Sequence, residues 1–183
     1  MFPVVDCFVG NMGIGAQIWF WEYRMDKANI ALVWAKTKIG ASYSQANRWA
    51  SNTFDCSSFV YRAYQAAGIH MVDKDSGAAA STSTTEVYAK GFKLLWPSTY
   101  AAIGQSLPCS PSLLASLSLE KGDLIFYNHT KTDRKNNITH VAMYAGDGKI
   151  IHARNPELGV RYDPLSYMQT SVCAITRLAA ANG

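Results

Sequence analysis

The sequence has no apolar run approaching the roughly 18 residues that a membrane-spanning helix requires. Its most apolar N-terminal stretch, residues 14–21, is short and is followed by charged residues. The pattern of a secretory signal is also missing, because no Lys or Arg precedes Arg24. The sequence therefore predicts no membrane insertion. We expect a chain that is made in the cytoplasm and reaches any outside target by another route.

Dense basic stretches are missing as well. The 17 Lys and Arg residues exceed the 13 Asp and Glu residues by only four, so nucleic acid is not an expected partner. The four cysteines form no CxxC pair, which argues against a zinc site. We expect no metal and no cofactor. Without a secretory signal, a disulfide framework is not expected either, which leaves one or more thiols available for chemistry.

What is present fits a single globular domain. The chain has 183 residues, 49% hydrophobic and 16% charged, which is enough apolar material for a core. Helical periodicity covers residues 26–39 and the stretch from Cys56 to Gly68. Strand patterns follow in the second half, at residues 123–127, 140–145, 149–153 and 171–178. Helices followed by an antiparallel sheet predict an α+β fold.

The same patterns suggest how the chain is divided. Residues 1–25 show no clear period and are interpreted as an N-terminal extension that precedes a domain at 26–179. Residues 180–183 are interpreted as the start of a linker. Residues 76–85 and 128–137 are predicted loops flanking a cleft, and residues 104–118 are predicted to be an irregular connection.

Cys56 stands where a nucleophilic cysteine is favoured. Asp55 is the predicted N-cap, which puts Cys56 in the first turn of its helix. The helix dipole and the unpaired N–H groups there favour the thiolate, and the same N–H groups can hold an oxyanion. Taken alone, this position also suits a small buried apolar residue.

Two histidines on a predicted hairpin supply a candidate base. A three-residue loop at 146–148 would set Ala142 opposite His152 and put His140 on the same face as His152. A two-residue turn at 147–148 would put the histidines on opposite faces. In the first register His140 can accept the thiol proton and His152 can orient His140, which is the logic of a catalytic triad.

Three segments together resemble the NlpC/P60 family of cysteine peptidases. Residues 55–60, DCSSFV, are similar to the family's nucleophile motif. Residues 122–126, GDLIF, resemble its Gly-Asp-Leu strand, and residues 140–153 resemble its two-histidine hairpin. The resemblance extends over roughly residues 28–178. It implies a papain-like core and hydrolysis of bacterial cell-wall peptides.

The resemblance also implies roles for further residues. Tyr43 matches a family tyrosine near the oxyanion, and Asp55 and Ser57 match residues that contact substrate. The segment Ser81–Thr85 corresponds to a Ser/Thr segment that helps to bind the peptide. The sequence departs from the family where Ser42 precedes Tyr43, in Arg48-Trp49-Ala50, and at Ser58, which stands in place of the commoner glycine.

The predicted function is therefore that of a peptidoglycan endopeptidase with Cys56, His140 and His152 as its catalytic residues. Its expected partner is a peptidoglycan stem peptide, and the bond most typical of the family joins γ-D-glutamate to a diamino acid. The alternatives are an N-acetylmuramoyl-L-alanine amidase, a cross-bridge peptidase, a non-catalytic wall-binding module and, more remotely, an acyltransferase. A single module without a secretory signal is typical of a phage endolysin, so phage-type release to the wall is expected. The oligomeric state is left open.

Overall fold

The computed structural model describes residues 14–71, 92–99, 105–131 and 136–179. Its helices are α1 (Ile14–Lys36), α2 (Cys56–Ala66), α4 (Pro111–Ser116) and the 3₁₀ helix η2 (Leu165–Ser171). Its strands are β1 (Ser42–Tyr43), β2 (Thr53–Phe54), β3 (Phe92–Trp96), β4 (Leu124–Tyr127), β5 (His140–Gly146), β6 (Lys149–Ala153), β7 (Val160–Pro164) and β8 (Val172–Leu178). Of the helices in these ranges, none combines the length and apolar character that crossing a membrane requires.

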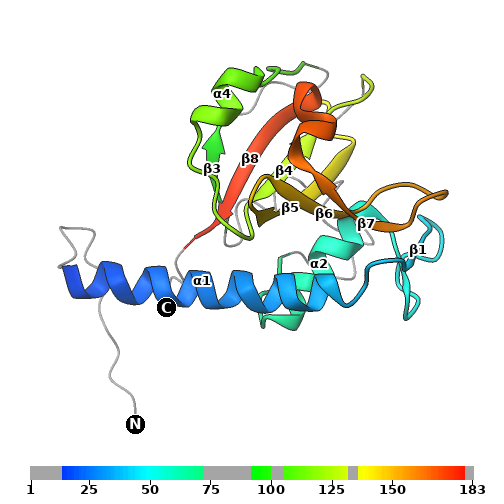
Figure 1. The fold of residues 1–183 in the computed structure, drawn as a ribbon, viewed down its shortest axis with the longest axis horizontal. Helices are drawn as coiled ribbons and strands as arrows, with labels where there is room; N and C mark the ends of the chain where they lie inside the picture. Colours follow the sequence, from blue (N-terminus) through cyan, green and yellow to red (C-terminus); the bar gives the residue numbers. More distant parts are fainter. Residues whose placement is uncertain (1–13, 72–91, 100–104, 132–135, 180–183) are drawn as a thin grey trace, which may run out of the picture.

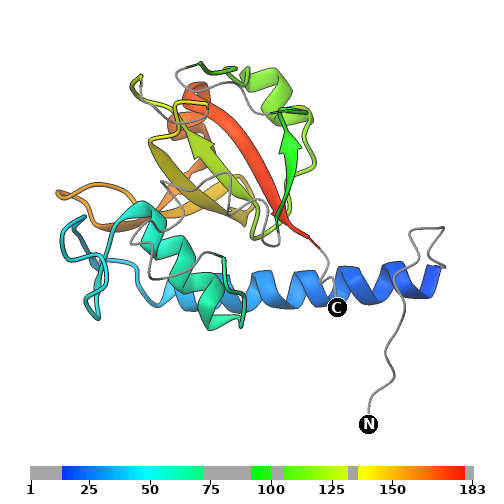
Figure 2. The same cartoon turned by 180° about the vertical axis from the view of Figure 1, so that it is seen from behind.

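Six strands form an antiparallel sheet in the order β3-β8-β4-β5-β6-β7. Helices α1 and α2 lie on one side of it, and α4 and η2 lie on the other (Figures 1 and 2). The alternation of β4 explains the layers, because successive strand residues face opposite sides. Leu124 and Phe126 join the core beneath α1 and α2, whereas Ile125 and Tyr127 join the core beneath α4 and η2. The predicted α+β fold is confirmed.

Helix α1 starts earlier than the periodicity predicts. It begins at Ile14 and ends at Lys36, whereas the sequence pattern predicts residues 26–39. Once a helix is nucleated, each added residue costs little and gains a backbone hydrogen bond, so it extends without an amphipathic pattern. Its C-terminal turn closes with Gly40 at a φ of +85°. The boundary at residue 25 thus falls inside a continuous helix, and the division of the chain stays a prediction.

Several elements were not predicted, among them β3, β7 and α4. Strands β3 and β7 form the two edges of the sheet. Helix α4 lies inside the stretch predicted to be irregular, where Ser110 caps it by accepting from the Leu113 N–H at 3.1 Å. Pro111 at the first position of α4 loses no hydrogen bond, because an N–H at this position would have no partner within the helix.

The histidine hairpin reaches the predicted register by a different route. The turn has two residues, Asp147 and Gly148, with φ angles of +51° and +64°, as a type I′ turn requires. A bulge between Tyr144 and Gly146 then shifts the pairing by one residue, so that Met143 faces Ile151. The prediction that a two-residue turn separates the histidines is therefore wrong, because the bulge supplies the extra residue.

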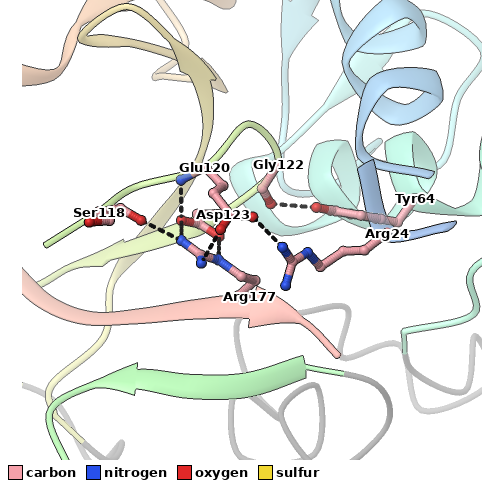
Figure 3. A network of polar contacts seen from close by, with 7 residues as sticks. All are labelled: Arg24, Tyr64, Ser118, Glu120, Gly122, Asp123 and Arg177. Carbon is pink, nitrogen blue, oxygen red and sulfur yellow. Dashed lines mark hydrogen bonds and ion pairs between the residues drawn. The ribbon is translucent and has the colours of Figure 1, made fainter. Parts of the chain in front are cut away.

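A polar network fastens α1 to the sheet (Figure 3). Arg177 on β8 donates from Nε to Oδ1 of the buried Asp123 and from Nη2 to Oδ2, each at 2.7 Å. Glu120 accepts from Arg177 at 2.6 Å and from Arg24 of α1 at 2.5 Å. The Tyr64 hydroxyl donates to the carbonyl oxygen of Gly122. The Gly-Asp turn before β4 therefore joins α1, α2 and the sheet.

Candidate active site

The start of α2 is built by a capping box around Asp55. Its Oδ1 accepts from the Ser58 N–H at 2.7 Å and from the Ser57 hydroxyl at 2.8 Å. In return, Ser58 Oγ accepts from the Asp55 N–H at 3.0 Å, and Arg48 donates to Asp55 Oδ2 at 2.8 Å. These bonds occupy helix-end groups that would otherwise lack partners. They fix Cys56 as the first residue of α2.

Tyr43 lies beside Cys56. It sits on β1, which pairs with β2 immediately before the capping box. Burial raises the pKa of the Tyr43 hydroxyl to about 12, and the Asp55 carboxylate and the thiolate form of Cys56 contribute to this shift. The hydroxyl is therefore protonated at neutral pH and can donate a hydrogen bond.

Backbone hydrogen bonds tie the Tyr43 segment to β7. The N–H of Gly40 donates to the Val160 carbonyl, and the Val160 N–H donates to the Ala41 carbonyl, each at 2.9 Å. The chains approach so closely that a Cβ on Gly159 would overlap the Ala41 carbonyl oxygen. Gly159 also has a φ of +61°, so glycine is favoured here on both grounds.

A line of hydrogen-bonded side chains crosses three strands. Nε2 of His140, on β5, lies 2.7 Å from Nδ1 of His152, on β6. Nε2 of His152 lies 3.1 Å from Oδ2 of Asp163, on β7. The three side chains follow diagonal positions on one face of the sheet, because His152 lies directly opposite Arg161. Helix α2 packs against β5 and β6, the strands that carry the two histidines.

Burial sets the charge of both histidines. Only 7% of His140 and 0% of His152 is exposed. Burial lowers the pKa of His140 well below its usual range, and the neighbouring His152, His129 and Arg154 lower it further. Burial also lowers the pKa of His152, where Asp163 opposes the shift and Arg154 and Arg161 add to it. Both rings are therefore neutral at neutral pH.

Aromatic rings surround His140. Tyr127 lies directly opposite it on β4, with ring centroids 5.8 Å apart. The ring of His129 stacks on Tyr127 and lies 6.3 Å from that of His140. No role for His129 was predicted, because it follows β4 in a loop whose path depends on the fold.

Comparison with known proteins identifies the family. A model described as the NlpC/P60 family matches residues 40–177. The chain belongs to the NlpC/P60 family. The family match includes Tyr43, the Asp55–Ser58 capping box, both histidines and Asp163, and ends within β8.

Two curated relatives share 31% identity with this NlpC/P60 chain. The gamma-D-glutamyl-L-lysine dipeptidyl-peptidase of Bacillus cereus aligns over 121 residues, 64% of this chain and 27% of that protein. The peptidoglycan DL-endopeptidase CwlO of Bacillus licheniformis aligns over 129 residues, 70% of this chain and 21% of that protein. The chain thus spans about a quarter of the length of these relatives. Among solved structures, NlpC2 from Trichomonas vaginalis is 26% identical, with a TM-score of 0.55, over 85% of this chain and 47% of that one.

The structure brings the predicted site residues into two groups. Tyr43, Asp55 and Cys56 lie together, and His140 contacts His152. Ser57 is fully buried and bonded to Asp55, so both side chains are occupied in the helix cap. Ser58 departs from the family glycine and is the residue that completes the capping box. Ser81–Thr85 lies outside the described residues.

Asp163 is the neighbour that sequence reasoning missed. Its strand, VRYDP, follows Gly159 and holds β-branched and aromatic residues, a signal that can indicate a strand. The contact with His152 depends on how β6 pairs with β7, which no local pattern reveals. Within the described ranges, no three His, Cys, Asp or Glu side chains gather in a way that could hold a metal ion.

Proposed function

We propose that the chain is a cysteine peptidase that hydrolyses stem peptides of bacterial peptidoglycan. The hydrogen bond between His140 and His152 is the observation that carries the proposal, because it gives a base next to a capped cysteine helix its orienting partner. The names of both Bacillus relatives describe peptidases, one of them of peptidoglycan. The bond we propose joins γ-D-glutamate to a diamino acid, as the name of the Bacillus cereus relative suggests.

The neutral state of His140 suits a general base. We propose that His140 takes the proton of the Cys56 thiol as the sulfur attacks the peptide carbonyl carbon. The backbone N–H of Cys56, together with the protonated Tyr43 hydroxyl, stabilises the resulting oxyanion. The C–N bond then breaks, and His140 returns its proton to the leaving amine.

Water completes the cycle. His140 accepts a proton from a water molecule, whose oxygen attacks the thioester carbonyl. The C–S bond breaks, and the acid product leaves as the thiol regains its proton. In this scheme His152 orients His140, while Asp55 and Ser57 hold the helix start that presents Cys56. Contact of Asp55 and Ser57 with substrate, and phage-type delivery of the chain to the wall, stay predictions.

Mass spectrometry of fragments released from purified peptidoglycan tests the proposal. The wild type, Cys56→Ala and Cys109→Ala are compared, because Cys109 is a buried free thiol in the core on the other side of the sheet. We expect new amino termini on the diamino acid from the wild type and Cys109→Ala, and none from Cys56→Ala.

Other products would redirect the assignment. Intact stem peptides released from the sugar would indicate an amidase, and cut cross-bridges would indicate a cross-bridge peptidase. Equal release by the wild type and Cys56→Ala, or no release from several wall types, would contradict the cysteine peptidase mechanism.

A further inference from the structure

Asp163 lies at the end of the line of side chains that begins at His140. Its carboxylate is buried on β7, and Oδ2 lies 3.1 Å from Nε2 of the fully buried His152. An ionised carboxylate can only accept hydrogen bonds. The hydrogen in this contact must therefore sit on Nε2 of His152.

This placement fixes the next ring. A neutral imidazole has one N–H, so His152 with hydrogen on Nε2 has only a lone pair on Nδ1. At 2.7 Å, His140 must then donate from its own Nε2. A neutral His140 with hydrogen on Nε2 keeps its lone pair on Nδ1, which is the form that a base needs. The opposite tautomer of His152 would reverse both assignments.

Two arginines keep Asp163 from charging His152. Arg154 Nη1 lies 3.4 Å from Oδ2 and Arg161 Nε lies 3.6 Å from Oδ1. Both cations oppose protonation of His152. A cationic His152 would carry hydrogen on Nδ1 and could no longer accept from His140. The other titratable rings near the pair are Tyr127 and His129, which flank His140.

We infer that Asp163 is a positioning residue that selects the tautomers of His152 and His140. Arg154 and Arg161 offset the negative charge of Asp163 and so keep His152 neutral. The inference rests on the proposed function, in which His140 is the base. In the proposed mechanism, His152 and His140 stand between Asp163 and the Cys56 thiol. The effect of Asp163 therefore falls on turnover rather than on peptide binding.

Nuclear magnetic resonance of the ¹⁵N-histidine-labelled full chain tests this directly. Long-range ¹H–¹⁵N correlations identify which ring nitrogen carries hydrogen. At neutral pH we expect hydrogen on Nε2 of both His140 and His152 in the wild type. Hydrogen on Nδ1 of either ring would overturn the inference, whether or not any variant folds.

Asp163→Asn supplies the functional half of the test. An amide can either accept from or donate to Nε2 of His152, so we expect a mixture of tautomers. We expect kcat on a peptidoglycan stem peptide to fall about 10–100-fold, as when the hydrogen-bond partner behind a metal-binding histidine is removed, with KM little changed. Asp147→Asn removes the same charge at the exposed hairpin turn, where asparagine suits a positive φ, and should leave both readouts unchanged.

The outcomes separate this inference from the proposed function. An Asp163→Asn protein with wild-type tautomers and wild-type kcat would overturn the positioning role. If the wild type cleaves no peptidoglycan, the proposed function fails. The wild-type spectrum still decides which tautomers His140 and His152 adopt.

Discussion

Acidification is predicted to destabilise the protein through its two buried histidines. His140 is 7% exposed and His152 is 0% exposed, and burial lowers the pKa of both rings in the folded protein. In the unfolded chain the same rings take up protons below a pKa of about 6.5. The unfolded state therefore binds more protons than the folded state below this pH. The stability that the two neutral rings contribute is fully present above about pH 6.5. It is lost as the pH falls toward the folded pKa values.

The slope follows from the number of protons. Each histidine lowers the free energy of unfolding by about 1.4 kcal/mol per pH unit while the pH lies between its unfolded and folded pKa values. Where both rings contribute, the slope is about 2.7 kcal/mol per pH unit. The range is wider for His140, whose pKa is lowered further by His152, His129 and Arg154. Since domains of this kind have about 5–15 kcal/mol of stability, one pH unit removes a large share of it.

Urea unfolding from about pH 7 to about pH 5 measures this slope. His140→Gln and His152→Gln should each remove about 1.4 kcal/mol per pH unit from it, whatever they do to absolute stability. His70→Gln is the matched control, because His70 is exposed and its replacement should leave the slope unchanged. If the two buried-histidine variants keep the wild-type slope, these rings are not excluded from protonation, and the argument for neutral tautomers fails.

Three further predictions concern the residues that hold the site together. Gly159→Ala should destabilise the protein by more than Gly148→Ala in thermal unfolding, because both glycines have positive φ but, of the two, only Gly159 is crowded, by the Ala41 carbonyl. The backbone strain shared by both variants costs about 1–2 kcal/mol, and equal losses would contradict the close approach of Gly159 to Ala41. Arg177→Met should cost about 3–5 kcal/mol in urea unfolding, because it leaves the buried Asp123 without its bidentate partner. A loss no larger than that of an exposed charge would refute this. Arg154→Gln should move the acid limb of the activity profile to higher pH, because this cation lowers the pKa of both buried histidines; a limb that stays or moves down would contradict the sign.

Much of the site was predictable because its parts are local. The capping box lies within four consecutive residues, Asp55 to Ser58, and a helix start depends mainly on such neighbours. The register of the histidine hairpin also depends on a few adjacent residues, although its turn and bulge were not predicted. The family motifs fall on these same local elements, and the match over residues 40–177 agrees with them.

Local sequence patterns were enough to predict the α+β fold, the cysteine at a helix start and the pair of histidines on neighbouring strands. These features follow from hydrophobic periodicity, capping and turn chemistry, which act over one or two helical turns or one hairpin. The remaining contacts depend on the assembled fold: Asp163 meets His152 and two arginines, His129 stacks on Tyr127, and Gly159 packs against Ala41. These contacts join segments whose approach depends on strand order and on the packing of the whole core, so no local pattern contains them.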